Sequence, residues 1–161
     1  MKIKILLLLI LVITFGCSEK EVNPCGLLTL QEVQRVAPDA RSHEYHPAST
    51  SKKKDNELCL WHDGGDQNVF MLFYYYSYSN PRELVTLGMP AGSRIIEING
   101  VGDAAAAGFG SNASDSNGSF RLFSAQVDDK IIGIRVRGIT DENSEGFEAL
   151  TEIANKALSR L

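Results

Sequence analysis

The sequence predicts an α+β domain built on an antiparallel sheet of about five strands, with an N-terminal and a C-terminal helix packed on one face. A capped helix begins the domain, several short apolar segments bounded by turn residues follow, and apolar residues at helical spacing close the chain. The predicted order is helix, two strands, short helix, at least three strands and helix. This order is typical of an antiparallel sheet with helices on one side.

The first 16 residues have the features of a secretory signal peptide. Lys2 and Lys4 precede an apolar run of eleven residues, Ile5 to Phe15, and small Gly16 follows. Such a run is too short to span a bilayer as a helix, which needs about 20 residues. A buried core helix is the alternative, but the terminal position and the polar residues that follow favour a signal peptide of residues 1–16.

Cys17 follows this signal in the stretch TFGC, which is typical of bacterial lipoproteins. These proteins are cut before a cysteine that carries lipid, and a small residue such as Gly16 suits the cut. We therefore expect lipid on Cys17, a lipidated tether over residues 17–24, and a membrane as the partner of the lipid. The expected location is the extracytoplasmic side of the cell envelope. Because Ser18 follows the cysteine, the outer membrane is expected if the cell is Gram-negative.

Residues 25–161 form the predicted single α+β domain. Removal of the signal, which contains two lysines, leaves 145 residues with 14 basic and 20 acidic side chains, a net charge of −6. This acidic balance argues against a nucleic-acid partner, because nucleic-acid binding needs basic surfaces that neutralise phosphates. The one basic run, Lys52-Lys53-Lys54, is interpreted as a solvated loop.

Cys25 and Cys59 are an even pair of cysteines in a domain that is expected to lie in an oxidising compartment. Such a pair predicts a disulfide, which would close a loop of about 35 residues and stabilise the domain by roughly 3–4 kcal/mol. Two free thiols, or half of a metal site, are the alternatives. The chain has no Cys-x-x-Cys motif that would support redox chemistry.

The first helix of the domain is predicted from Leu30 to Val36. Thr29 and Glu32 have the spacing of a capping box, in which each side chain satisfies a free backbone N–H at the start of a helix. Pro38 disfavours helical geometry in the residue before it, so the helix should end there. The next segment, 39–56, has few apolar residues and is predicted to be a loop that the disulfide restrains.

Two paired strands are predicted at 58–62 and 69–77, on either side of the turn residues Asp63-Gly64-Gly65-Asp66. The second strand is apolar on both faces, which indicates a central position. Alternation of side chains places three tyrosines in a row on one face: Tyr74, Tyr76 and Tyr78. The row is either a contact face for a sugar or a partner, or packing beneath loops or a helix. Packing is the favoured interpretation.

The second half of the domain starts with a short helix at 81–87, whose first residue is proline. A strand is predicted at 94–98, and residues 111–119 form a polar loop. Strands at 120–127 and 130–137 are predicted to form a hairpin. A closing helix begins near residue 143, and its inner stripe consists of Phe147, Leu150, Ile153, Ala154, Ala157, Leu158 and Leu161.

Glycines after the strand at 94–98 match part of a dinucleotide-binding fingerprint, Gly100-x-Gly102-x-x-Ala105. That fingerprint needs a full helix after the glycine turn, inside a βαβ unit. Here the alanine run ends after four residues, at Gly108, and a polar loop follows. We therefore predict no nucleotide site. A tight glycine turn is expected instead, with Asp103 accepting backbone N–H bonds and the small alanines allowing close packing.

Several segments together resemble the small secreted lipoproteins, best known from actinobacteria, that carry one α+β domain of unknown function. The resemblance spans nearly all of residues 25–161 and depends on the order of its short motifs, since each is weak alone. It implies a disulfide between Cys25 and Cys59 and an envelope address, and it carries no catalytic residues. The chain departs from the pattern at Ala37-Pro38, where glycine is frequent, and in its tyrosine-rich strand. The matching motifs are Cys25-Gly26-Leu27-Leu28-Thr29, Cys59-Leu60-Trp61, Gly100-Val101-Gly102-Asp103-Ala104-Ala105, the late hairpin and the Ala/Leu-rich final helix.

The residues most typical of a metal site are His43, Glu44, His46 and His62. Pro47 follows the first three, so solvated loop histidines are the favoured interpretation. Because no known catalytic motif is present, we expect a non-enzymatic binding or accessory protein without a cofactor. Its expected partner is an envelope protein, the cell wall or a small molecule. The alternative is a metal-assisted hydrolase of the envelope that uses the three histidines.

Overall fold

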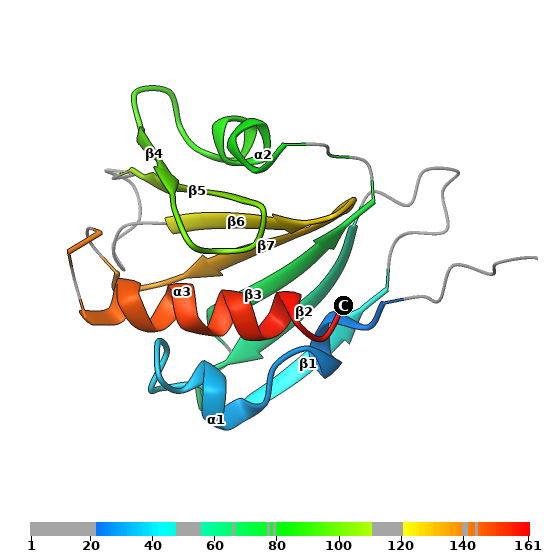
Figure 1. The fold of residues 1–161 in the computed structure, drawn as a ribbon. Helices are drawn as coiled ribbons and strands as arrows, with labels where there is room; N and C mark the ends of the chain where they lie inside the picture. Colours follow the sequence, from blue (N-terminus) through cyan, green and yellow to red (C-terminus); the bar gives the residue numbers. More distant parts are fainter. Residues whose placement is uncertain are drawn as a thin grey trace, which may run out of the picture.

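The chain folds around one seven-stranded antiparallel sheet accompanied by three α-helices within the residues that the structure describes (Figure 1). The structure is a computed structural model. The predicted α+β class and antiparallel sheet are confirmed, whereas the predicted number of about five strands is too low. The described residues are 22–47, 56–65, 67–76, 78, 80–110, 121–139, 142–143 and 145–161.

The strands lie in the order β1-β2-β3-β7-β6-β5-β4, and every neighbouring pair is antiparallel. Three strands therefore follow one another at one side of the sheet and four at the other. The two groups meet where β3 pairs with β7. The strands are β1 (Ser42–His46), β2 (Asn56–His62), β3 (Asn68–Tyr75), β4 (Arg94–Ile98), β5 (Ala104–Phe109), β6 (Arg121–Val127) and β7 (Lys130–Val136).

Strand β1 is the first of two strands that the sequence analysis missed, because residues 39–56 were expected to form a loop. It lies at an edge of the sheet and pairs only with β2, with His43 opposite Trp61 and Tyr45 opposite Cys59. Its side chains are exposed or half-buried. An edge strand held by main-chain pairing needs no buried apolar face, so the hydrophobic pattern does not reveal it.

Strand β5 is the second missed strand, in the alanine run after the glycine turn. Alanine is depleted in strands, so local preference argues against it. Helix α2 (Pro81–Gly88) explains the small residues on one face of this strand, because Val85 and Met89 pack against that face. A Cβ atom on Gly108 would lie 2.6 Å from Met89 Cγ and 2.8 Å from Val85 Cγ1. Tertiary packing therefore determines the strand here.

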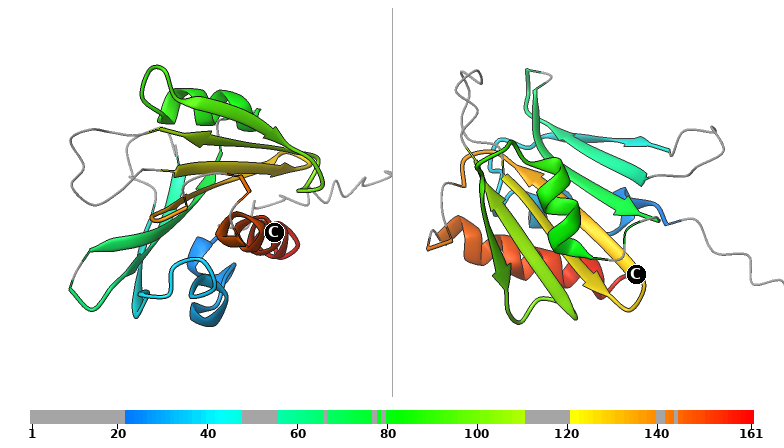
Figure 2. Two further views of the ribbon diagram at one scale, coloured as in Figure 1. Left: turned by 90° about the vertical axis from the view of Figure 1, so that its left-hand side faces the viewer. Right: turned by 90° about the horizontal axis from the view of Figure 1, so that it is seen from above.

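The helices lie on both sides of the sheet (Figure 2). Helices α1 (Leu30–Val33) and α3 (Glu145–Leu158) share the larger apolar core, and α2 packs over β5 and β6 on the other face. The predicted inner stripe of α3 is buried from Phe147 to Leu158, and Leu161 is half-buried. Among the described helices, none has the length and apolar character needed to cross a membrane.

Helix α1 is shorter than predicted but starts as expected. The Thr29 N–H donates to Glu32 Oε2 at 2.9 Å, and the Glu32 N–H donates to Thr29 Oγ1 at 3.3 Å, which confirms the capping box. Arg160, just after α3, donates two hydrogen bonds of 2.8 Å to the Glu32 carboxylate. These bonds, followed by the backbone bond from Thr29, hold the pKa of Glu32 far below its usual range. Glu32 therefore joins the start of the domain to its C-terminal end.

Candidate functional site

The disulfide is the one predicted covalent feature that lies within the described residues. Cys25 and Cys59 are joined, with their Cα atoms 5.0 Å apart, so the predicted pairing is confirmed. The bond ties the short 3₁₀ helix η1 (Pro24–Gly26) to β2. The predicted lipid site, Cys17, and most of its tether lie outside the described residues, so lipidation stays a prediction.

The three tyrosines of the predicted row do not all lie together. Tyr74 is 8 % exposed and belongs to the larger core, and its ring contacts that of Tyr76 at 4.8 Å between centroids. Tyr78 instead contacts Tyr75, with centroids 5.3 Å apart. Tyr75 points to the opposite face, where it approaches Gly133 near α2. Strand β3 ends at Tyr75, so the alternation that predicted the row stops before Tyr78.

The histidines considered as metal ligands are divided between the two faces of the sheet. His43 contacts the ring of Trp61 on the core face, with centroids 5.7 Å apart. The register of β1 and β2 places His46 opposite Leu58 and His62 opposite Ser42, on the other face and at different heights. Among the described residues, no group of three or more His, Cys, Asp or Glu side chains is placed to hold a metal ion.

The glycine turn between β4 and β5 is hydrogen-bonded to α3 and to the turn between β6 and β7. Asn155 of α3 accepts a hydrogen bond from the Gly102 N–H and donates one to the Gly100 carbonyl. The Asp103 carboxylate accepts a bond of 2.7 Å from the Asp128 N–H, as predicted for this residue. No crossover helix follows, since the next element is β5. The turn therefore fastens α3 and the β6–β7 hairpin to the sheet.

A groove at one end of the sheet is the strongest candidate for a binding site. It consists of two hollows of about 520 and 570 Å³ that both contact Arg35 and Gly146. The N-terminal part of α3 forms one wall, and the segment after α1 forms the other. We call this surface the distal groove. Its charged residues are Arg35, Asp39, Asp63, Arg137, Glu148 and Glu152.

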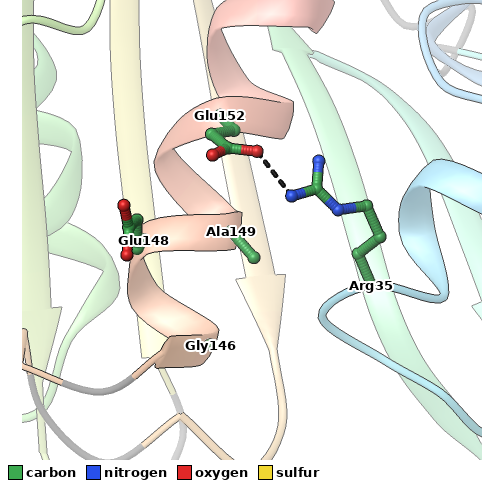
Figure 3. Close-up of a pocket in the computed structure, with 5 residues that line it drawn as sticks. All are labelled: Arg35, Gly146, Glu148, Ala149 and Glu152. Carbon is green, nitrogen blue, oxygen red and sulfur yellow. Dashed lines mark hydrogen bonds and ion pairs between the residues drawn. The ribbon is translucent and has the colours of Figure 1, made fainter.

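The ion pair between Arg35 and Glu152 spans the distal groove (Figure 3). Arg35 reaches toward α3, where Ala149 and Glu152 lie on the near side, while Glu148 lies farther from it. The Arg35 and Glu152 side chains are 44 % and 51 % exposed. An exposed pair contributes only about 0–1 kcal/mol to stability, so its charges can be exchanged for those of a ligand at little cost.

In the other half of the distal groove, the charged side chains are held by hydrogen bonds to neighbouring residues. Arg137 donates a hydrogen bond of 2.8 Å to Gln67, and Asp63 accepts backbone bonds from Gly65 and Gln67 at 2.8 and 3.0 Å. The bonds from Gln67 and Gly65 are the main causes that lower the pKa of Asp63. This part of the groove therefore presents a fixed cation beside a fixed carboxylate. The sequence analysis missed the groove, because its residues come from α3, β3 and several separate connecting segments, which no single periodic pattern links.

The distal groove and the entry of the N-terminal segment lie at opposite ends of β3. Val69, near the start of this strand, lines the groove. Tyr76 lies just beyond its other end, and the described chain begins on that same side of the sheet (Figure 1). Eight strand residues at about 3.3 Å each separate the two ends by roughly 25 Å. The length of the sheet therefore separates the start of the described chain from the groove.

Comparisons with known proteins found no family model, no curated protein and no solved structure that matches the chain. The resemblance to small secreted lipoproteins stays a prediction from the motifs.

Proposed function

We propose that the protein is an envelope-anchored lipoprotein whose domain is a non-enzymatic binding or accessory module, with the distal groove as its binding surface. The observation that carries this proposal is the position of the groove, at the end of the sheet opposite the tether. A lipid on Cys17 would place the tethered end next to a membrane. The groove would then face the space in which envelope proteins, the cell wall and small molecules are found.

The chemistry of the distal groove favours a partner that carries both signs of charge. Arg137 and Asp63 offer a fixed cation and a fixed anion, and the exposed pair of Arg35 and Glu152 can open. Apolar residues also line the groove, among them Val36, Val69, Ala149 and Ile139. Small-molecule sites typically enclose about 300–1,000 Å³, so a short peptide or an amino-acid-containing compound would fit.

Replacement of Cys17 with alanine is expected to leave a larger, uncleaved precursor that takes up no fatty acid. The reason is that processing of a lipoprotein requires the modified cysteine at the cut. Gel mobility and incorporation of labelled palmitate check this result in intact cells. The disulfide variant Cys25→Ala/Cys59→Ala serves as the control, because it removes cysteines without touching the lipid site. Normal cleavage and acylation of Cys17→Ala would contradict the proposed anchor.

A photoreactive phenylalanine at Ala149 is expected to cross-link the natural partner in intact cells. Ala149 lies in the distal groove on α3. The matched control is the same residue at Leu87, which is 67 % exposed on α2, on the other side of the sheet. Mass spectrometry of the linked species identifies the partner. A distinct species from Ala149 that disappears with Arg35→Glu supports the groove, whereas the same pattern from both positions, or none, contradicts it.

A further inference from the structure

The described helices cover only part of one face of the sheet. Helices α1 and α3 share the core on the opposite face, whereas α2 packs mainly on β5 and β6. In the view from above in Figure 2, β1, β2 and β3 extend beyond α2 on one side. We call the surface of β1, β2, β3 and β7 on the α2 side the open face.

One row of side chains crosses the open face from an acid to a base. The strand registers pair Glu44 with Leu60 and Met71 with Arg135, and Leu60 is paired with Met71 in turn. Directly paired residues point to the same face, so these four side chains lie in one line across the strands. Glu44 is 64 % exposed, and the guanidinium carbon of Arg135 lies over the Phe73 ring, 5.5 Å from its centroid. The row therefore carries a negative charge at one end and a positive charge at the other.

The residues between these charges are apolar and partly exposed. Leu60 and Met71 are half-buried, and so is Leu58 in the next row, where it pairs with Phe73. By contrast, Leu72 of β3 points to the opposite face and is fully buried in the larger core. A sheet face with apolar side chains that the described helices leave uncovered is typical of a contact surface.

We propose that the open face is an interface between two copies of this chain, related by a two-fold axis that runs between β2 and β3 and parallel to them. Rotation about this axis exchanges the two sides of the open face. Glu44 then lies against the partner's Arg135, Leu60 lies against the partner's Met71, and symmetry repeats both contacts. An axis across the strands in this row would instead set Glu44 against the partner's Glu44, a repulsive contact. The charges of the row therefore select both the occupant and the direction of the axis.

Helix α2 leaves room for this arrangement. A helix with its side chains is about 10–12 Å thick, and two sheets packed face to face lie about 10 Å apart. The sheet of the second copy would therefore occupy the same layer as α2, with its edge strand β1 beside that helix. Covering an edge strand with a helix is one way in which proteins prevent further pairing of the edge.

The same axis leaves both distal grooves at one end of the dimer, because it runs along the strands. The starts of the two described chains lie together at the other end. Two lipid anchors could then enter one membrane while both grooves face away from it. This consequence rests on the proposed lipid at Cys17, whereas the interface itself does not.

The size of the open face predicts a weak dimer. Four strands about 4.8 Å apart and three rows about 7 Å apart cover roughly 400 Å². A standard interface buries about 800 Å² on each partner, so association should depend on the protein concentration.

Mixing two charge-reversal variants tests the interface. Glu44→Arg and Arg135→Glu each create like-charge contacts in their own dimer, so each should raise the dissociation constant by about tenfold or more. In a mixture of the two variants, both contacts pair opposite charges, so a mixed dimer should form as readily as the original one. Sedimentation equilibrium of the full chain in a density-matched detergent measures the mass at several concentrations. Glu148→Arg is the matched control, because it makes the same change of charge on α3, at the opposite face of the sheet, and should leave association unchanged.

Leu60→Glu and Met71→Lys repeat the mixing test at the centre of the row, in case Arg135→Glu does not fold. Each variant alone should associate more weakly than the original protein, because a charge replaces an apolar contact. In the mixture, the new acid of one chain faces the new base of the other, so the mass should rise again. A mixture that stays monomeric in both pairs of variants overturns the interface.

Hydroxyl-radical labelling of Met71 distinguishes a second copy from other occupants of the open face. We expect labelling in dilute protein, protection as the concentration rises, and loss of that protection in Glu44→Arg. Protection at every concentration would assign the face to another segment of the same chain. A labelled monomer at all concentrations up to about 1 mM would leave the face to a different protein. Either result overturns the dimer, as does an equal effect of Glu44→Arg and Glu148→Arg on association.

Discussion

Replacing Gly102 with alanine is expected to destabilise the domain by more than about 3 kcal/mol, because both the backbone and the surroundings require glycine there. Its φ angle is +55°, in the left-handed region that disfavours other residues. A Cβ atom would also lie 2.1 Å from the Gln126 carbonyl oxygen and 2.8 Å from Leu158 Cδ1. The backbone cannot move away without breaking the bond between the Gly102 N–H and Asn155.

Gly100→Ala is the matched control for this substitution. Gly100 has a φ of +79°, also left-handed, but no atom lies within 4 Å of the place that a Cβ would occupy. Only the conformational cost, about 1–2 kcal/mol, is expected there. Urea unfolding followed by tryptophan fluorescence measures both variants. Equal losses of unfolding free energy would show that the clash with β6 and α3 is relieved, contrary to this account.

Removal of the disulfide is expected to lower the unfolding free energy by about 3–4 kcal/mol, because the bond closes a loop between residues 34 positions apart. The double variant Cys25→Ala/Cys59→Ala tests this by urea unfolding, with and without a reducing agent. The fully buried position of Cys59 adds a small cost for the lost sulfur atom.

The reducing agent is the internal control for the disulfide variant. It should lower the unfolding midpoint of the original domain to near that of the double variant, and leave the double variant unchanged. A loss below about 1 kcal/mol in the double variant would mean that residual structure already restricts this loop in the unfolded chain.

The elements that could be predicted from the sequence are those whose own residues show a hydrophobic or helix-capping pattern. The strand at 94–98 and the start of the helix at Thr29 are as predicted, and the stripe from Phe147 to Leu158 is buried. Strands β1 and β5 could not be predicted in this way. The first is an exposed edge, and the second consists of small residues that only the packing of neighbouring segments explains.

The candidate site also contains some features that could be predicted from the sequence and others that could not. The disulfide followed from the number of cysteines and the expected compartment, since assigning Cys17 to the lipid site leaves two of the three cysteines, which allow a single pairing. The distal groove could not be found, because residues as distant as Arg35, Asp63 and Arg137 meet only in the folded chain. The burial of Glu57 could have been predicted from the sequence. This residue alternates with Cys59 and Trp61 on one face of a strand, and a buried carboxylate needs a hydrogen-bond partner.

The strand order also has a consequence for how the chain folds. Within the group β1 to β3 and within the group β4 to β7, each strand pairs with its neighbours in sequence, so each group can form from local contacts. The single long-range pairing joins β3 to β7, where Phe73 lies opposite Gly133. Bringing β3 and β7 together closes the long loop between them. Most of the loop-closure entropy is lost at this step, before the new contacts compensate for it. We therefore expect two meanders to form early and the β3–β7 seam to close in the rate-limiting step.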